Sequence, residues 1–345
     1  MSIYQQQLFG ARTFLGYTLD PDAEGVKNNL LLSDNVLVEL WDKGVLYFHP
    51  KNEVAANSIL LSVGVHGNET APIEIIDQLV SDIFSGKISV KHNLLIVIAN
   101  PDAINSQSRE VAENMNRLFN NDAKIKDGDG AERRRCIRLM DYSKRFFSRH
   151  ATYKFHYDLH TAIRDSFYEK FAISPNVSLV SLVEAQYSVL GQWGIEAILA
   201  TDKKSATYSA FTAQHCGAIS FTLELGKVKP FGENDLEKMS SLTMGLYKMI
   251  SANMNPPTET QIPKRFRVAT EIIKQSKEFQ LCFPSSTANF TEFAIGDLLA
   301  VDKDCQYRVV CDGERILFPN ESVAIGQRAL VIIRPENNPK ASNHE

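Results

Sequence analysis

Short apolar runs alternate with amphipathic stretches along the N-terminal part of the chain. The predicted strands occupy residues 58–65, 93–99, 153–160, 195–201 and 217–225, and all of them except 153–160 are mainly apolar. Apolar residues recur at helical spacing over residues 71–84, 131–147, 178–194 and 234–250. Strands that alternate with helices are typical of a parallel or mixed sheet with helices on both faces. We therefore predict an α/β domain over residues 1–255.

Two regions have strand patterns without intervening helices. The runs NVLVEL and GVLYFHP, on either side of WDK, predict a hairpin within residues 30–50. A proline-containing stretch at 253–265 predicts a linker, and short apolar runs separated by DKD, DGE and PNES follow it. This spacing predicts a smaller C-terminal all-β domain over residues 256–345, with a disordered tail at 336–345.

Charge and length narrow the classes of function. The chain has 345 residues and a formal net charge of −4, which gives no general attraction to nucleic acid or to an anionic membrane. We expect neither as a partner, so an anionic ligand requires a local basic pocket. No apolar run is long enough to span a membrane and the N-terminus lacks a secretory signal pattern, so a cytoplasmic location is the default expectation.

Cysteines and an arginine run allow simple structural interpretations. The five cysteines are odd in number and include no CxxC pair, which is typical of a reducing compartment. We interpret each of them as a small core residue. Arg133 to Arg135 lie in the predicted helix at 131–147, and we interpret them as a solvated face of that helix.

The stretch SVGVHGNETAP places His66 and Glu69 between a predicted strand and a predicted helix. One interpretation is a turn in which both side chains face water. The other is a metal site, because ligands of open α/β sheets bind outside the carboxyl ends of strands. Three-residue spacing across a tight turn allows both side chains to reach one ion, although this pair alone is weak evidence.

A second histidine strengthens the metal hypothesis. His160 ends the predicted strand YKFHYDLH, where a lone histidine is more often a core residue with its hydrogen bonds satisfied. Together with His66 and Glu69 it completes two imidazoles and a carboxylate, the ligand set of catalytic zinc sites that keep a position for water. Asp158, two residues earlier, is a candidate to accept the other ring N–H of His160.

Glu224 lies within the apolar run SFTLELGK. A carboxylate is costly to bury without a partner or a task, although an edge-strand position in solvent is the simpler alternative. Water activated by zinc needs a neighbouring base, and Glu224 is our candidate for that base.

Cations for an anionic substrate follow the strand that ends at Asn100. The segment NSQSREVAENMNRLF contains Arg109, Asn116 and Arg117, and Arg164 follows His160 in HTAIR. Guanidinium groups bind carboxylates through paired hydrogen bonds, although arginines on surface helices are common. From the residues alone we infer a metal hydrolase that acts on an anionic substrate, with Arg164 as a further carboxylate-binding residue and Lys227 as a weaker candidate.

Six motifs in a fixed order carry a resemblance: HGNETAP, NPDAI, MNRLF, DLHTAIR, TLELGK and PFGENDL. In this order they resemble the desuccinylase/aspartoacylase family of zinc carboxypeptidase-like hydrolases, over roughly residues 59–320. The resemblance implies a zinc-carboxypeptidase-like mixed sheet flanked by helices. It also implies that the C-terminal β domain covers the active site and admits only small acyl amino acids.

The resemblance also assigns roles to residues. It implies that His66, Glu69 and His160 hold one Zn²⁺ ion per chain and that Glu224 is the base. Arg109 then polarises the scissile carbonyl. Asn116 and Arg117 form a clamp for a substrate carboxylate.

The form DLHTAIR is closer to the desuccinylases of this family than to its aspartoacylases. This implies hydrolysis of N2-succinyl-L-glutamate to succinate and L-glutamate, the last step of arginine catabolism by the succinyltransferase pathway. Deacylation of another N-acyl amino acid and cleavage of small peptides stay open, because residue spacing does not distinguish a succinyl from an acetyl group. A non-catalytic dicarboxylate-binding protein with structural zinc is a weaker alternative, because such zinc usually has four protein ligands. A homodimer is possible.

Overall fold

The computed structural model describes residues 1–24, 27–51, 57–120, 124–175, 180–201, 205–252 and 261–336. Most of the predicted linker, the predicted boundary between residues 255 and 256, and all but the first residue of the predicted tail lie outside these ranges.

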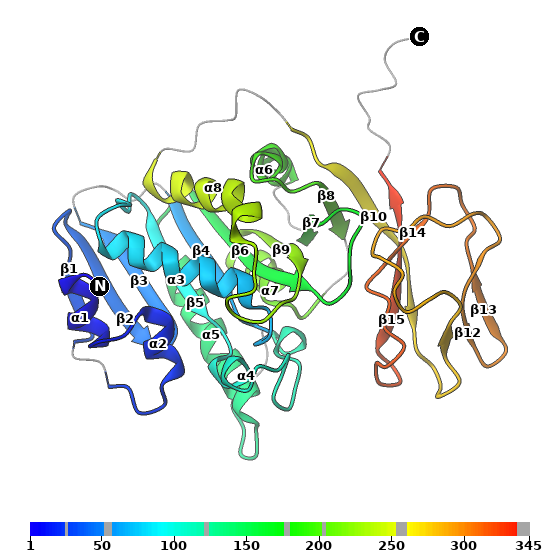
Figure 1. The fold of residues 1–345 in the computed structure, drawn as a ribbon, viewed down its shortest axis with the longest axis horizontal. Coiled ribbons are helices and arrows are strands. Elements are labelled where there is room, and N and C mark those ends of the chain that lie inside the picture. Colours follow the sequence, from blue (N-terminus) through cyan, green and yellow to red (C-terminus); the bar gives the residue numbers. More distant parts are fainter. Residues whose placement is uncertain are drawn as a thin grey trace, which may run out of the picture.

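A twelve-stranded mixed sheet runs through the described part of the molecule (Figure 1). Its strand order is β1-β2-β3-β5-β4-β6-β9-β7-β8-β10-β15-β14. The strands of its N-terminal part are β1 (Asn29–Leu31), β2 (Val36–Asp42), β3 (Val45–Pro50), β4 (Asn57–Val63), β5 (Asn93–Ile98), β6 (Tyr153–Ala162), β7 (Lys170–Pro175), β8 (Ala197–Thr201) and β9 (Ile219–Lys227). The neighbours β5, β4, β6 and β9 are parallel, so the carboxyl ends of these four strands meet at one edge.

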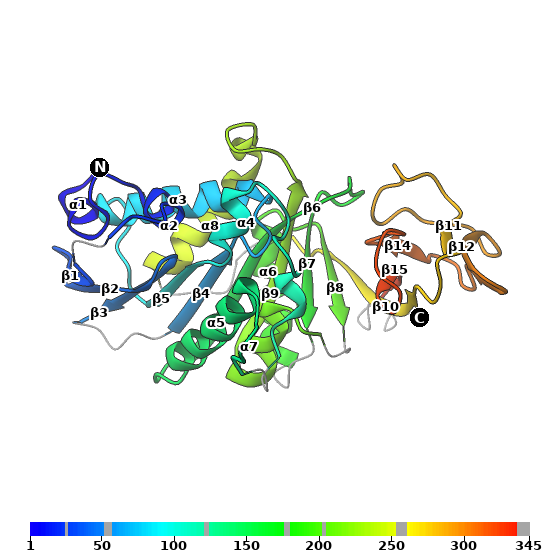
Figure 2. The same cartoon turned by 90° about the horizontal axis from the view of Figure 1, so that it is seen from below.

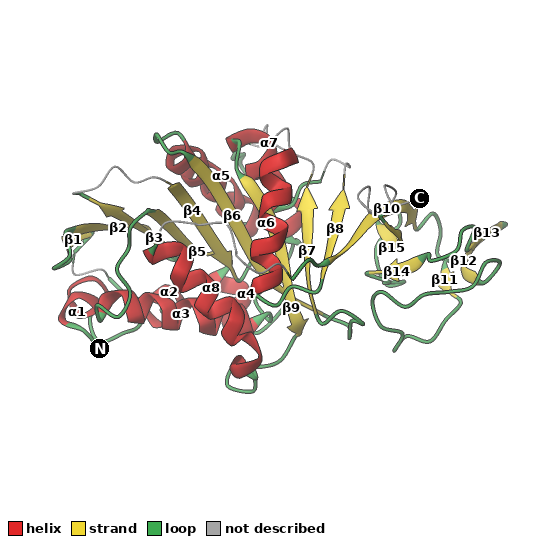
Figure 3. Cartoon of the chain, turned by 90° about the horizontal axis from the view of Figure 1, so that it is seen from above, coloured by secondary structure: helices red, strands yellow, loops and turns green. Residues whose placement is uncertain are grey.

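Helices cover both faces of this sheet (Figures 2 and 3). One face shares a core with α1 (Ile3–Phe9), α2 (Phe14–Leu19), α3 (Thr70–Phe84), α6 (Val180–Gln192) and α8 (Ser240–Ser251). The opposite face packs against α5 (Ala131–Phe147) and α7 (Tyr208–Cys216). Three short elements complete the set: α4 (Pro101–Asn105), η1 (Met115–Arg117) and η2 (Leu236–Met239).

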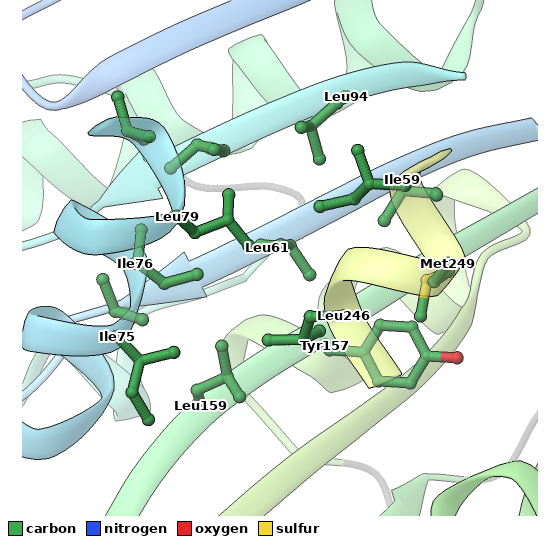
Figure 4. Packing of buried hydrophobic residues seen from close by; sticks show 14 of the residues in the cluster. Ile59, Leu61, Ile75, Ile76, Leu79, Leu94, Tyr157, Leu159, Leu246 and Met249 are labelled. Atoms are coloured by element: carbon green, nitrogen blue, oxygen red, sulfur yellow. The ribbon is translucent and has the colours of Figure 1, made fainter. Parts of the chain in front are cut away.

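The central strands β4 and β5 are mainly apolar because both of their faces are covered. In β4, Ile59 and Leu61 join the core on the α3 side, whereas Leu60 joins the core on the α5 side. Figure 4 shows Ile59 and Leu61 packed with Leu79 of α3 and Leu246 of α8. This continuous burial explains why the runs at 58–65 and 93–99 lack the alternation of a half-exposed strand.

The C-terminal strands extend the main sheet and also form a small sheet of their own. They are β10 (Lys264–Ile273), β11 (Gln280–Leu281), β12 (Leu298–Asp302), β13 (Cys305–Arg308), β14 (Arg315–Leu317) and β15 (Arg328–Pro335). Strand β10 pairs in parallel with β8 and antiparallel with β15, while β11, β12 and β13 make the three-stranded sheet. The predicted fold class, a mixed α/β sheet with a C-terminal β part, is confirmed.

Among the elements without a counterpart in the sequence prediction are α1, α2, β7 and α7. The helices among them have seven, six and nine residues. Helices this short are marginal in isolation and depend on caps and tertiary packing. Ser2 forms a capping box at α1, and Thr13 and Thr207 cap α2 and α7. The prediction missed these helices because it relied on apolar periodicity and not on capping residues.

The cysteine interpretation holds only in part. All five cysteines are free, but Cys282 and Cys305 are exposed and only Cys136 is buried. The exposed pair lies in the small C-terminal part, where much of the strand surface faces solvent. No helix in the described ranges is long and apolar enough to cross a membrane.

The arginine run is not a uniformly solvated face. Arg134 is exposed, but Arg135 is buried and donates to the carbonyl oxygens of Ala99, Ile98 and Lys43 and to the Asp42 carboxylate. Its guanidinium therefore connects α5 to the end of β5 and to the β2–β3 turn. The prediction failed because adjacent helical positions point in different directions.

We expect Arg135→Ala to lower the free energy of unfolding by about 3 kcal/mol, because it leaves a carboxylate and three carbonyls without their buried donor. Urea denaturation monitored by circular dichroism measures this effect. The matched control is Arg134→Ala, an exposed neighbour on the same helix, for which we expect a change within about 0.5 kcal/mol. Equal destabilisation of the two variants would contradict the structural role of Arg135.

Candidate metal centre and active site

The loop between β4 and α3 carries the first two candidate ligands. Gly67 has no room for a side chain, because a Cβ atom there would lie 2.1 Å from the carbonyl carbon of Ala103 in α4. This close approach of the two backbones turns the loop over the end of the sheet. Glu69 occupies the N-cap position of α3 but makes no capping hydrogen bond with its side chain. Its carboxylate instead points toward His66.

The neighbouring strands β6 and β9 supply the other candidates. His160 and Glu224 are directly opposite each other in the parallel pairing, near the carboxyl ends of both strands. His66, Glu69 and His160 each offer one ligand atom, and these atoms all lie within 4.8 Å of one another. The three residues are 2–3% exposed. Residues distant in the sequence thus meet at one buried point.

The geometry of this cluster fits a cation. His66 Nδ1 lies 2.8 Å from Glu69 Oε1, and His160 Nδ1 lies 2.8 Å from Glu69 Oε2. The buried Nδ1 of His66 has no hydrogen-bond partner among the described residues in spite of this short distance. Two imidazoles and one carboxylate are the protein donors typical of catalytic zinc. The residues present therefore fit zinc.

Neighbouring groups determine the charge of the two histidines. Burial lowers the pKa of His66, which keeps its ring neutral and its lone pair available. Burial also opposes the charged form of His160, but the carboxylates of Asp158 and Glu69 raise the pKa of His160 well above its ordinary value. Asp158 Oδ2 lies 2.9 Å from His160 Nε2, so the structure places Asp158 where a ligating histidine needs an acceptor.

Glu224 is buried beside the cluster. Its Oε2 atom has no hydrogen-bond partner among the described residues. Burial raises the pKa of Glu224 to about 7, and Glu69 and Asp158 add to the shift. A carboxyl group whose pKa is near neutrality can both accept and release a proton at neutral pH.

Arg109 reaches the cluster, and Asn116 and Arg117 lie in the following loop. Arg109 Nη1 donates to Glu69 Oε1 at 2.8 Å. Asn116 is buried, and its Oδ1 accepts from the backbone N–H of Tyr208 at the start of α7. Arg117 retains exposed surface, and its Nη1 donates to the carbonyl oxygen of Asn116 at 2.8 Å. Burial and the nearby guanidiniums of Arg328 and Arg109 lower the pKa of Arg117 to about 10.

Arg164 and Lys227 make contacts away from the metal cluster. Arg164 donates to the carbonyl oxygen of Ser285, and so joins the loop after β6 to the C-terminal part. Lys227 pairs with Asp165 at 2.9 Å on the exposed surface.

Several residues that position the site were not predicted. Asn114 Oδ1 accepts from the N–H of Asn116 and lies 3.2 Å from His66 Nε2, so it connects a candidate ligand with the turn that carries Arg117. The buried carboxylate of Glu132 accepts from the three N–H groups of residues 111–113 and from Asn100, which fixes the loop after Arg109. Neither residue stands out in the sequence, because Asn114 reaches His66 and Glu132 reaches residues 111–113 only in the folded chain.

Two family models match the chain. The succinylglutamate desuccinylase/aspartoacylase catalytic domain matches residues 55–250, and the AstE/AspA barrel-sandwich hybrid domain matches residues 261–336. The chain belongs to the succinylglutamate desuccinylase/aspartoacylase family. This membership confirms the family resemblance of the six motifs.

Individual relatives in this family are similar over nearly the whole chain. The succinylglutamate desuccinylase of Idiomarina loihiensis is 40% identical over 310 residues, which cover 88% of this chain and 90% of the relative. The crystal structure of succinylglutamate desuccinylase from Vibrio cholerae has a TM-score of 0.86 at 32% identity and covers 95% of this chain and 96% of its own. The structure from Vibrio parahaemolyticus has a TM-score of 0.85 at 32% identity, with 94% and 95% covered.

Proposed function

We propose that this protein hydrolyses the amide bond of N2-succinyl-L-glutamate to give succinate and L-glutamate. The observation that carries the proposal is the buried group of His66, Glu69 and His160 with Glu224 beside it. Relatives that match most of the chain are named succinylglutamate desuccinylase, which supports this substrate over other acylated amino acids. The same reaction would place the protein at the end of arginine catabolism, and we retain the cytoplasm as its proposed location.

His66, Glu69 and His160 would hold Zn²⁺ through one nitrogen or oxygen atom each. Zinc in such a site acts as a Lewis acid for water and for the substrate carbonyl. Asn114 and Asp158 are placed to accept the outer ring N–H groups of the two histidines, which would leave both Nδ1 atoms available to hold the ion.

Glu224 is the proposed general base. Its unpaired Oε2 and a pKa of about 7 suit a group that takes a proton from the attacking water and delivers it to the leaving nitrogen. Arg109 would stabilise negative charge on the carbonyl oxygen, because guanidinium has five N–H donors and only one nitrogen of Arg109 is engaged with Glu69.

The substrate has three carboxylates, so the pocket must supply cations in a protein of net charge −4. We assign Arg117 to one carboxylate, with Asn116 beside it, and Arg164 to another. Arg117 retains solvent-exposed surface and directly follows Asn116, which supports this role. For Arg164 the role requires that its guanidinium bind substrate while it also contacts Ser285.

We also propose a catalytic domain over residues 1–255 and a C-terminal β domain over 256–345 that covers the site. A hydrogen bond and an electrostatic effect support this arrangement. Arg164 donates to Ser285, and the charge of Arg328 is close enough to affect Arg117. A cover of this kind would exclude polypeptides and admit small acyl amino acids.

The purified zinc-loaded protein should be assayed with succinylglutamate, N-acetylaspartate and a short peptide. We expect kcat/KM for succinylglutamate to exceed the other values by at least about 100-fold, because unpaired charged groups in the pocket penalise a substrate that lacks the matching carboxylates. Preference for N-acetylaspartate or for the peptide would replace the substrate assignment. Zinc binding without hydrolysis of any of the three would indicate a dicarboxylate-binding protein.

A further inference from the structure

A line of buried polar side chains continues from the metal cluster into the core. Asp158 Oδ2 faces His160, and Asp158 Oδ1 accepts from Ser62 Oγ at 2.5 Å. Ser62 Oγ lies 2.8 Å from His156 Nε2, and His156 Nδ1 lies 2.6 Å from Thr212 Oγ1. These four residues behind His160 are fully buried. The line spans strands β4 and β6 and helix α7.

The number of available protons determines the direction of the hydrogen bonds from Ser62 to Asp158 and from His156 to Ser62. Ser62 has a single hydroxyl proton, and the Asp158 carboxylate can only accept, so Ser62 donates to Asp158. Ser62 Oγ must then accept from His156, which places the proton of that ring on Nε2. Burial lowers the pKa of His156 to about 4, so the ring is neutral and its Nδ1 is an acceptor. The Thr212 hydroxyl donates to it at 2.6 Å, a shorter distance than the 3.1 Å and 3.4 Å to the carbonyl oxygens of Ser209 and Tyr208.

We propose that Thr212, His156 and Ser62 act as positioning residues that set the orientation of Asp158 and thereby the tautomer of His160. This inference rests on the proposed zinc site and adds to it residues that lie outside the ligand set. With Asp158 Oδ1 held by Ser62, its Oδ2 accepts the Nε2–H of His160. The lone pair of His160 Nδ1 is then fixed toward Glu69 and the ion. Aligned hydrogen bonds in a low-dielectric interior strengthen one another, so the line acts as a unit.

The test is the zinc dissociation constant of Ser62→Ala, measured by competition with a chromogenic chelator. We expect zinc to bind about tenfold more weakly, because loss of outer partners of a ligating histidine typically costs 10- to 100-fold in affinity. Ser58→Ala is the matched control. Ser58 is a fully buried serine on the same face of β4, and its hydroxyl has no hydrogen-bond partner in the described residues. We expect that control to bind zinc like the wild type.

A double-mutant cycle separates positioning from a general loss of packing. In an Asp158→Asn background, Ser62→Ala should change zinc affinity by less than about twofold, because the partner through which it acts is already altered. Equal zinc affinities for Ser62→Ala and Ser58→Ala would overturn the proposal. So would a full effect of Ser62→Ala that persists in the Asp158→Asn background.

The tautomer of His156 in the wild type provides a measurement that does not depend on folding of the variants. Nitrogen-15 chemical shifts of the ring should show the proton on Nε2, and a proton on Nδ1 would overturn the proposal. None of these readouts uses hydrolysis, so they are separate from the assay of substrate choice. A wild-type protein that binds no zinc would overturn the metal site together with the positioning line, whereas failure of the substrate assay would leave both intact.

Discussion

Glu224→Gln is expected to lower kcat by about three orders of magnitude while zinc stays bound. The substitution keeps the shape of the side chain but removes the group that exchanges a proton with water and with the leaving nitrogen, and a positioned acid–base group typically contributes 10²–10⁴-fold. Because Glu224 is not among the three clustered ligand residues, the zinc content should be unchanged. Steady-state kinetics together with metal analysis of the same preparation measure both quantities.

Glu169→Gln is the matched control for this prediction. Glu169 is an exposed residue just before β7, and its carboxylate lies close to Gly226 near the end of β9, so its charge is lost without a change at the cluster. We expect it to retain wild-type kcat. Turnover of Glu224→Gln at the wild-type rate would remove Glu224 from the chemistry. Loss of zinc from that variant would instead assign its carboxylate to the ligand set.

Removal of zinc is expected to abolish turnover and to lower thermal stability. Dialysis against a chelator should reduce hydrolysis to background, and about one equivalent of zinc should restore it. A ligand that binds only the folded state stabilises it by about 4 kcal/mol at a concentration 1,000-fold above its dissociation constant. Without the ion, the buried side chains of His66, Glu69 and His160 lose the cation that holds them together. The thermal stability of the protein should therefore fall. Differential scanning calorimetry before and after dialysis measures the change.

Two histidine variants localise this effect. His66→Ala should bind zinc poorly and lack activity, because it removes one of the three donors in the cluster. His215→Ala changes an exposed histidine in the last turn of α7 and should keep both zinc and activity. Full turnover by the chelated protein, after metal analysis shows the ion is gone, would refute the zinc-dependent mechanism.

The sequence was sufficient to identify the elements that carry the site. The runs before His66 and Glu224 are mainly apolar, because parallel strands covered on both faces are buried along most of their length. A carboxylate or imidazole at such a position is costly to bury unless it has a partner. These two facts, with the order of the strands along the chain, predicted a meeting point at one edge of the sheet, and the structure brings those side chains together there.

Other features required the tertiary structure, because they depend on which strands become neighbours and in which register. Ser62 lies opposite Asp158 only in the β4–β6 pairing, and no local pattern around Ser62 distinguishes it from Ser58. Arg135 differs from Arg134 only in the direction it takes from α5.

The sequence by itself determined the chemical types at the site and their positions at the ends of strands, because local polarity and hydrophobic periodicity are encoded residue by residue. The tertiary structure decided which partners orient those groups. It also placed the C-terminal strand β10 alongside β8 in one continuous sheet, where the sequence indicated only a separate β region. Such contacts join residues far apart along the chain, and their free energy depends on the packing of both surfaces at once.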